Sequence, residues 1–200
     1  FLDTGAMYRA LSWYLIKEKI NYSDVKNLNS ILSNISIQFK SVTGSKQNVI
    51  INNHNVTEKI RSQEISSIVS SIASIKEVRE FLVKEQRKIG DRGGIVAEGR
   101  DIGSKVFPQA ELKIFLTATI NERAKRRKNE LEAMGNCNID FEQLKNEIER
   151  RDYEDSNRKI SPLIKAKDAI EIISDGNTIN QVVEKILETY FETIPKELQL

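Results

Sequence analysis

Three short apolar segments, separated by longer stretches, most constrain the fold of this 200-residue chain. They lie at residues 94–97, 112–116 and 169–173. The last two have the length of one buried strand, and the stretches between them show helical periodicity. Short apolar strands joined by helical crossovers are typical of parallel sheets. The pattern therefore predicts an α/β fold with a parallel sheet flanked by helices.

Apolar residues at intervals of three or four predict amphipathic helices around these strands. The opening residues 1–5 resemble the end of a strand, and Met7 and Leu11 begin a helical stripe directly after it. A shorter helix is predicted over residues 25–32, capped by Ser23 or Asp24. The clearest stripe closes the chain, from Ile179 to Phe191.

The pattern changes between residues 34 and 92, which predicts a lobe inserted into the core of residues 1–33 and 93–200. Residues 35–39 alternate between apolar and polar and predict a half-buried strand. A turn at Gly44, a second strand at 49–51, a turn at 52–55 and a short edge at Val56 complete a small antiparallel sheet. Two helices follow, marked by apolar residues at 65–73 and 78–82.

Charge and cysteine content disfavour several classes of function. The 31 Lys and Arg residues are nearly balanced by 29 Asp and Glu, so the net charge of +2 is too small for a general nucleic-acid surface. The single cysteine, Cys137, excludes an internal disulfide and fits a reducing cytoplasm. One histidine, His54, leaves little basis for a metal cage or a Ser-His mechanism.

No apolar run approaches the ~20 residues that a membrane span needs. From these features we expect a cytoplasmic protein that binds neither nucleic acid nor membrane. We also expect it to be a monomer.

The strand at 94–97 is followed by Glu98, Gly99, Arg100 and Asp101. In open parallel sheets, ligands bind beyond the carboxyl ends of the strands. A carboxylate there can hold Mg²⁺ through water, and an arginine can hold phosphate. On local grounds alone, a strand followed by a solvated turn explains these residues better.

The opening segment has a similar layout. Asp3, Thr4 and Gly5 end the strand, and Arg9 lies about one turn into the following helix. A helix N-terminus favours anions, and Arg9 would add a bidentate phosphate clamp. The alternative is that Thr4 only caps the helix and Arg9 is a surface residue.

A basic cluster at 122–127 places Arg123, Arg126 and Arg127 on one face of a predicted helix. Stacked like charges repel one another, so a bound polyanion would relieve that repulsion. A solvated basic face and a nucleic-acid contact are the alternatives.

A second charged cluster contains Arg151, Asp155 and Arg158, which share a helix face at i, i+4 and i+7. Few apolar residues hold this segment down, and Pro162 stops the helix. A charged, weakly anchored helix and loop is typical of a mobile lid. A plain surface helix, with Arg151 and Asp155 in an ordinary salt bridge, is the alternative.

The order of these clusters is more informative than any one of them. Five stretches occur in the order and spacing of bacterial cytidylate kinases, which the chain resembles over essentially its whole length. They are Leu-Asp-Thr-Gly-Ala-Met-Tyr-Arg (2–9), Ile-Arg-Ser-Gln-Glu (60–64), Ala-Glu-Gly-Arg-Asp-Ile-Gly (97–103), Val-Phe-Pro-Gln-Ala (106–110) and Arg-Asp-x-x-Asp-x-x-Arg (151–158).

The resemblance implies a nucleoside-monophosphate kinase with a P-loop NTPase-like fold, an inserted CMP-binding lobe and a helical lid at about 120–163. Such enzymes transfer the γ-phosphoryl group of ATP to CMP or dCMP with Mg²⁺, giving CDP or dCDP. Positioning and cationic stabilisation carry such transfers, and no covalent nucleophile is needed.

The resemblance also implies roles for individual residues. Thr4, Arg9 and Arg100 match the contacts to the acceptor phosphate, and Glu98 stands where an Asp is common, with a water-mediated role toward Mg²⁺. The remaining matches are Ser70, Arg79 and Asp101 on the cytosine edge, Asp155 on the ribose hydroxyls, Arg151 and Arg158 near the transferred phosphoryl group, and Arg123 and Arg127 on the donor side of the lid.

The chain contains no Gly-x-x-x-x-Gly-Lys-[Ser/Thr] sequence. In the family that loop cradles the ATP phosphates, its Lys reaches the β- and γ-phosphates and its Ser/Thr holds Mg²⁺. The chain also opens without Met, so we expect a truncation that lacks the first strand, the P-loop and the first helix. The missing part would lie in a longer chain, such as a fusion with a pantoate-activating ligase, and these 200 residues alone should be poorly active.

Two other functions stay open at this point. The chain could be a non-catalytic nucleotide-binding or interaction module derived from such a kinase. An RNA-binding domain that uses the basic segment around Arg123 and Arg127 is disfavoured by the small net charge and by the lack of stacking aromatics there.

Overall fold

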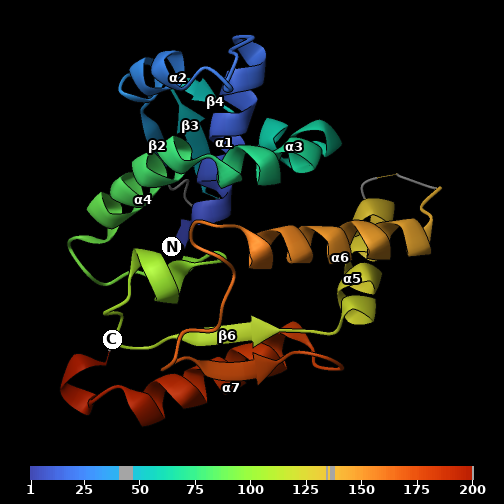
Figure 1. Ribbon diagram of the computed structural model, residues 1–200. Coiled ribbons are helices and arrows are strands. Elements are labelled where there is room, and N and C mark those ends of the chain that lie inside the picture. Colours follow the sequence, from blue (N-terminus) through green and yellow to red (C-terminus); the bar gives the residue numbers. More distant parts are fainter. Residues whose placement is uncertain (41–46, 134, 136–137, 200) are drawn as a thin grey trace. The chain divides into compact units, whose positions relative to one another are not determined.

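The computed structural model describes residues 1–40, 47–133, 135 and 138–199 (Figure 1). The predicted turn at Gly44 and the single cysteine, Cys137, lie outside them. The chain forms two compact units, residues 1–102 and 103–200. The first contains β1 (Leu2–Asp3), α1 (Thr4–Lys17), α2 (Val25–Leu32), β2 (Ile37–Lys40), β3 (Asn48–Ile51), β4 (His54–Asn55), the 3₁₀ turn η1 (Lys59–Arg61), α3 (Gln63–Ser74), α4 (Lys76–Gly90) and β5 (Ala97–Glu98).

The π-helical turn η2 (Ile102–Val106) connects the two units. The second unit continues with β6 (Ile114–Thr117), α5 (Ile120–Ala133), α6 (Phe141–Asn157), β7 (Ile170–Ile173), α7 (Ile179–Thr193) and the 3₁₀ turn η3 (Lys196–Leu198). The order of strands and helices confirms the predicted mixed α/β class.

In the first unit, β1 and β5 pair in parallel, with Leu2 opposite Ala97. The strand predicted at 94–97 begins later than expected, because Gly93 and Gly94 have φ of 69° and 62° and belong to the preceding turn. A left-handed backbone cannot continue a strand, and glycine adopts it without a Cβ clash. Only Ala97 is shared between the predicted and the observed strand.

Helix α1 forms the centre of the first unit, where it packs against α3 and β3. Its stripe of Met7, Ala10, Leu11 and Leu15 is fully buried, as the periodicity predicts. Burial of Met7, Leu11 and Leu15 contributes roughly 1.5–3 kcal/mol for each side chain through removal of apolar surface from water. Helix α3 and strand β3 belong to the predicted inserted lobe, whereas α1 belongs to the predicted core. Their contacts do not separate lobe from core, so the lobe boundaries at 34 and 92 stay a prediction.

The predicted antiparallel meander is confirmed as the order β2–β3–β4. Asn52 and Asn53 have φ of 42° and 67°, as the two central residues of a tight hairpin turn require. The turn is therefore shorter than predicted. His54 and Asn55 form the edge strand opposite Ile51 and Ile50.

In the second unit, β6 and β7 pair in parallel over four residues, from Ile114 opposite Ile170 to Thr117 opposite Ile173. Helices α5 and α6 pack on each other. The predicted closing helix is confirmed as α7, which begins with a capping box between Thr178 and Gln181. None of the described helices is both long and apolar enough to cross a membrane.

Candidate functional site

Asp3 and Glu98 lie opposite each other at the ends of the parallel strands β1 and β5. Asp3 caps α1, since its Oδ1 accepts a hydrogen bond from the Ala6 amide at 2.7 Å, and its Oδ2 accepts one from Arg9 Nη2 at 2.8 Å. The hydroxyl of Thr4 donates to the backbone oxygen of Glu98 at 2.7 Å. The alternative of Thr4 as the helix cap is therefore wrong, and Thr4, Arg9 and Glu98 come together at this strand edge.

Two glycines allow neighbouring side chains to approach the backbone closely at the carboxyl ends of β1 and β5. A Cβ atom on Gly99 would lie 2.2 Å from Thr4 Oγ1 and 2.8 Å from Ile102 Cδ1, so no other residue fits without displacing them. A Cβ atom on Gly5 would lie 2.9 Å from Arg9 Nη1, which places the guanidinium group over the first turn of α1. Arg9 and the amides of that turn can act together on an anion.

The pKa of Glu98 is raised above its ordinary value. Partial desolvation of the carboxyl is the main cause and the neighbouring negative charge of Asp3 is the second, while Arg9 and Arg61 act in the opposite direction. A cation bound beside Glu98 and Asp3 would relieve this unfavourable arrangement.

Magnesium usually binds proteins through one or two carboxylates together with substrate phosphates. Among the described residues, no cluster of three or more His, Cys, Asp or Glu side chains could enclose a metal ion. Glu98, with Asp3 beside it, therefore fits a Mg²⁺ ion shared with a nucleotide phosphate. The two carboxylates alone would not complete the coordination of the ion.

Arg79 and Asp101 form a buried ion pair, with their side chains 2 % and 7 % exposed. Arg79 Nη1 also donates to the backbone oxygen of Ala73 at 3.0 Å, and the guanidinium carbon lies 5.4 Å from the centre of the Tyr8 ring. The Nε donor of Arg79 is buried with no hydrogen-bond partner among the described residues. A buried donor without a partner is costly, so this atom is a candidate contact for a ligand.

Ser70 and Arg100 complete the predicted set in the first unit. Ser70 is half-buried on α3, one helical turn before Ala73, whose carbonyl holds Arg79. Arg100 is half-buried directly before Asp101. The predicted base readers thus come from α3, from α4 and from the segment after β5.

In the second unit, the three arginines of α5 do not form one shared basic face. Arg123 pairs with Asp152 of α6, and Arg127 pairs with Glu130 at 2.6 Å. Arg126 turns toward the segment after β7, where Ser174 accepts two of its hydrogen bonds. Each guanidinium group is therefore held separately, which orients Arg123 and Arg127 and removes much of the expected repulsion.

Asp155 and Arg158 lie at the end of α6, which stops at Asn157. Arg158 lies just beyond the helix, where its Nη1 is 3.3 Å from Asp155 Oδ1 and its Nε donates to the Ser161 carbonyl at 2.5 Å. Asp155 is only 6 % exposed, whereas Arg151 is exposed on the same helix. The prediction that Arg151, Asp155 and Arg158 share a helix face is therefore wrong for Arg158, because the helix ends one residue before it.

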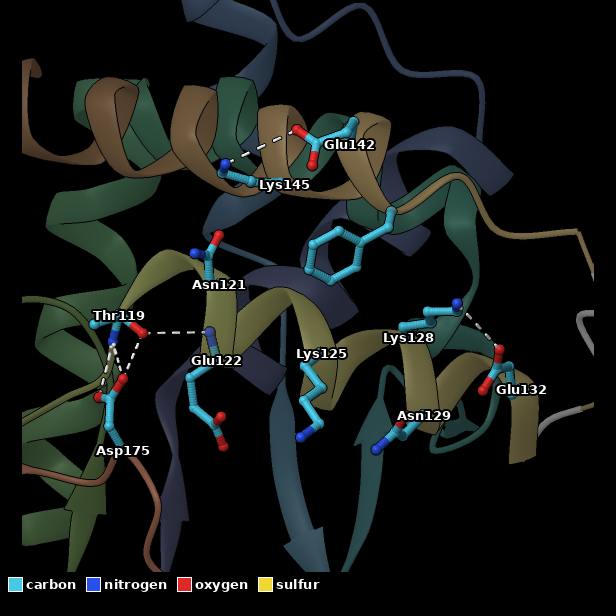
Figure 2. Close-up of a pocket in the computed structure, with 11 residues that line it drawn as sticks. Thr119, Asn121, Glu122, Lys125, Lys128, Asn129, Glu132, Glu142, Lys145 and Asp175 are labelled. Carbon is cyan, nitrogen blue, oxygen red and sulfur yellow. Dashed lines mark hydrogen bonds and ion pairs between the residues drawn. The ribbon is translucent and has the colours of Figure 1, made fainter.

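A groove of about 730 Å³ is lined by Thr119, α5, the start of α6 and Asp175. Figure 2 shows the residues that line it. Lys125, Lys128 and Lys145 line it together with four carboxylates, so its charges largely cancel. Lys128 Nζ lies 3.8 Å from Glu132 Oε1. Lys145 Nζ lies 3.8 Å from Glu142 Oε2. None of the predicted arginines lines this groove, and it has no excess positive charge to select a polyphosphate.

The comparisons with known proteins agree with these features. A family model described as cytidylate kinase matches residues 1–192. The chain belongs to the cytidylate kinase family. The resemblance drawn from the five sequence stretches is thereby confirmed, while the roles of the individual site residues stay predictions.

Several relatives of this chain are named bifunctional pantoate ligase/cytidylate kinase. The chain is 68 % identical over 200 residues to the protein of that name from Prochlorococcus marinus strain MIT 9312, covering 100 % of the chain and 39 % of the relative. The protein of the same name from Trichodesmium erythraeum strain IMS101 is 48 % identical over 193 residues, covering 96 % of the chain and 36 % of the relative. The chain thus spans about two fifths of the length of these curated relatives.

The sequence patterns did not indicate several residues that organise the candidate site. Asp3 carries a local signal, since an Asp directly before an apolar helical stripe is a good N-cap. Tyr8, which lies against Arg79, carries none. Neither do Ser174 and Asp175, whose partners are Arg126 on α5 and Thr119 directly before it, about 50 residues earlier in the chain.

Proposed function

We propose that the protein containing this chain is a cytidylate kinase, which transfers the γ-phosphoryl group of ATP to CMP or dCMP. The buried pair of Arg79 and Asp101 is the observation that carries the proposal most directly. A buried arginine and carboxylate offer both donors and acceptors, which the edge of a cytosine ring requires. Family membership supports the same activity.

The acceptor phosphate would bind at the start of α1. Arg9, oriented by Asp3, and Arg100 supply positive charge, and Thr4 sets the spacing between β1 and β5 through its bond to Glu98. The amides of the first helical turn that Asp3 does not cap add to this positive region. Such a site fixes the attacking oxygen of the monophosphate, which is the main requirement for in-line transfer.

The base would be read by Ser70, Arg79 and Asp101. Cytosine offers acceptors at O2 and N3 and a donor at N4. Arg79 uses two of its five N–H groups on Ala73 and Asp101, and the Nε group has no partner among the described residues. A carboxylate that accepts from N4 would disfavour uracil, which has an oxygen at that position.

The sequence resemblance assigns the ribose and the transferred group to residues of α5 and α6 and to Arg158. Asp155 would accept from a ribose hydroxyl, while Arg151 and Arg158 would stabilise charge on the phosphoryl oxygens. Arg123 and Arg127 would contact the donor side. Mg²⁺ held by Glu98 through water would neutralise phosphate charge when bound.

The 200 residues lack the sequence of an ATP phosphate loop, and the relatives are much longer than this chain. We therefore infer that the ATP cradle lies in a longer protein, of which this chain is the C-terminal, cytidylate kinase part. The apolar stripe of α7 supports this, because no residue of that helix is buried and Ile179, Leu187 and Phe191 are exposed. Amphipathic helices normally bury such a stripe against further structure. A cytoplasmic location remains part of the same proposal.

The test is a coupled assay of ADP formation from ATP and CMP. We expect turnover by the full protein, within the usual kinase range of roughly 1–100 s⁻¹, and very little by residues 1–200 alone. Normal turnover by the 200 residues would contradict the need for an external ATP cradle. No turnover by the full protein would favour a non-catalytic nucleotide-binding module.

Base selectivity provides a second test. In the full protein, Arg79→Lys and Asp101→Asn should reduce the preference for CMP over UMP by about tenfold or more, since each weakens a charge-assisted hydrogen bond. Glu80→Gln is the matched control, because Glu80 is an exposed acid next to Arg79 on α4. Unchanged preference in both site variants would show that other residues read the base.

A further inference from the structure

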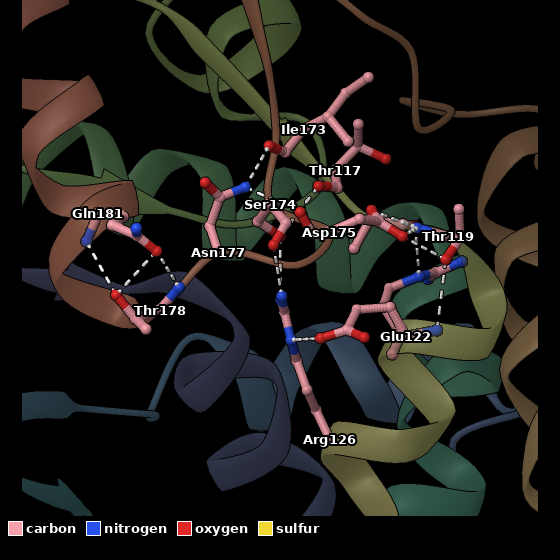
Figure 3. Close-up of polar contacts among 12 residues, drawn as sticks. Thr117, Thr119, Glu122, Arg126, Ile173, Ser174, Asp175, Asn177, Thr178 and Gln181 are labelled. Carbon is pink, nitrogen blue, oxygen red and sulfur yellow. Dashed lines mark hydrogen bonds and ion pairs between the residues drawn. The ribbon is translucent and has the colours of Figure 1, made fainter.

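Residues of the turn that follows β7 form hydrogen bonds with the start of α5 (Figure 3). Thr119 directly precedes α5, and Glu122 lies three residues later, which is the sequence pattern of a capping box. The hydroxyl of Thr119 accepts a hydrogen bond from the Glu122 amide at 3.3 Å, as in that motif. In a complete capping box, the Glu122 side chain would accept a hydrogen bond from the Thr119 amide. Here Asp175 accepts that hydrogen bond instead.

Asp175 accepts from the Thr119 amide, at 2.9 Å to Oδ2, and from the Thr119 hydroxyl. These hydrogen bonds, from the hydroxyl first and the amide second, hold the pKa of Asp175 below its usual range, and the charge of Arg126 adds to the effect. Glu122 is thereby released from the cap. Its carboxylate instead accepts from Arg126 Nε at 2.8 Å, one turn further along the helix.

Arg126 connects this helix to Ser174, the residue directly after β7. Its Nη1 donates to Ser174 Oγ at 2.9 Å and its Nη2 to the Ser174 backbone oxygen at 2.6 Å. Ser174 is 3 % exposed and is fixed in turn, since its amide donates to the Thr117 carbonyl at 2.8 Å. The planar guanidinium group thus donates to three acceptors through three different nitrogens, which the single ammonium nitrogen of a lysine could not reproduce.

We propose that Arg126, with Ser174 and Asp175, is a positioning residue that sets the direction of α5 and so places Arg123 and Arg127. The inference rests on the proposed kinase function for these two arginines. Arg126 lies between them in sequence and has the same charge, but its donors face Ser174 and Glu122. Arg123 and Arg127 follow the clamped first turn, so a change in helix direction would displace both.

The test uses the full protein and three variants of the clamp: Arg126→Lys, Arg126→Ala and Asp175→Asn. We expect Arg126→Ala to lower kcat about tenfold, as misplacement of positioning groups commonly does, with the KM for CMP unchanged. Amides 120–127 should exchange hydrogen about fivefold faster, the effect of losing roughly one net hydrogen bond. Arg126→Lys and Asp175→Asn should give smaller changes in the same direction, and they keep the test usable if Arg126→Ala does not fold.

Lys128→Ala is the control, because Lys128 is a neighbouring cation on α5 whose ion pair with Glu132 is long, at 3.8 Å. It should leave kcat and exchange unchanged. A double-mutant comparison then separates positioning from direct contact. In an Arg123→Ala/Arg127→Ala background, Arg126→Ala should lower kcat further by less than about twofold, since the groups it positions are gone.

An additive loss in that background, together with a raised KM for ATP and normal exchange of α5, would show that Arg126 contacts the nucleotide itself. Normal kcat and normal exchange in all three variants would also overturn the inference. If the unmodified full protein does not phosphorylate CMP, the proposed function fails, but the exchange measurement still decides whether the clamp holds α5.

Discussion

Arg79 and Asp101 form an ion pair whose members are almost completely buried, although they lie 22 residues apart on α4 and after β5. The pair is tied to the end of α3 through the Ala73 carbonyl and lies against the ring of Tyr8. Helices α1, α3 and α4 and the segment after β5 therefore meet at this ion pair. The same residues are the proposed readers of the cytosine base, so stability and substrate recognition are linked at this point.

Removal of one member of this pair should destabilise the fold strongly. We expect Asp101→Leu to lower the free energy of unfolding by about 3–5 kcal/mol, because Arg79 would be left as an uncompensated buried charge. Urea denaturation followed by circular dichroism measures this. The control is Lys76→Ala, which removes an exposed pair with Glu80 at 3.8 Å and should cost less than about 1 kcal/mol.

The double variant Arg79→Met/Asp101→Leu separates the two roles of the pair. Replacing a whole buried pair by apolar residues is often close to neutral, so much of the lost stability should return. Selection of CMP over UMP should not return. Stability as low as in Asp101→Leu alone would contradict the view that the unpaired charge causes the loss.

A methyl group on Gly99 should disrupt the strand edge. The added Cβ atom would lie 2.2 Å from Thr4 Oγ1, so the hydrogen bond from Thr4 to Glu98 must break or the strands must separate. We expect Gly99→Ala to cost about 1–3 kcal/mol of unfolding free energy, as overpacking usually does, and to raise the KM for CMP.

Gly94→Ala is the matched control for that variant. Apart from its chain neighbours, no atom of the described residues lies within 4 Å of the added Cβ, and the φ of 62° opposes the change. The cost should therefore be about 1–2 kcal/mol of backbone strain. The KM for CMP should not change in this variant. A similar rise in KM in both variants would show that the effect of Gly99→Ala is not local.

Glu98 should make stability depend on pH in a direction unusual for a carboxylate. Its pKa is raised in the folded chain by desolvation and by Asp3, so the folded state binds more protons than the unfolded state. Its contribution to stability is full below the ordinary value of 4.5 and is lost as pH rises through the folded pKa. Glu98→Gln should therefore gain stability relative to the unmodified protein as pH rises.

Urea denaturation of both proteins across a pH series measures this difference. Glu64→Gln serves as the control for loss of one carboxylate, since Glu64 is an exposed acid in the same unit. A stability difference for Glu98→Gln that falls with rising pH would mean that the carboxylate is held in its charged form, as a tight ion pair would do.

Asp155 should act on the nucleotide sugar. We expect Asp155→Asn to lower kcat/KM for CMP about tenfold, because a charge-assisted hydrogen bond to a ribose hydroxyl would be weakened. The variant also weakens the contact of Asp155 with Arg158, at 3.3 Å, so kcat should fall as well. Glu154→Gln, an exposed neighbour on α6, should behave as the unmodified protein does. Equal kinetics for both variants would exclude Asp155 from the site.

Local sequence pattern determined the elements of this protein well, because burial of an amphipathic face imposes a period that the sequence must carry. The stripes of α1 and α7 and the parallel pair β6 and β7 were all predicted in place. The order of five motifs also determined the family. Boundaries failed where backbone conformation decided them, as at Gly93 and Gly94.

The contacts between distant segments were decided only by the tertiary structure. The sequence grouped Arg123, Arg126 and Arg127 by helical spacing, but it carried no sign that Ser174, about 50 residues later, would accept the hydrogen bonds of Arg126. Spacing fixes which side chains share a face of a helix. Which partners meet that face depends on long-range packing, and here that packing separates one arginine from the two beside it.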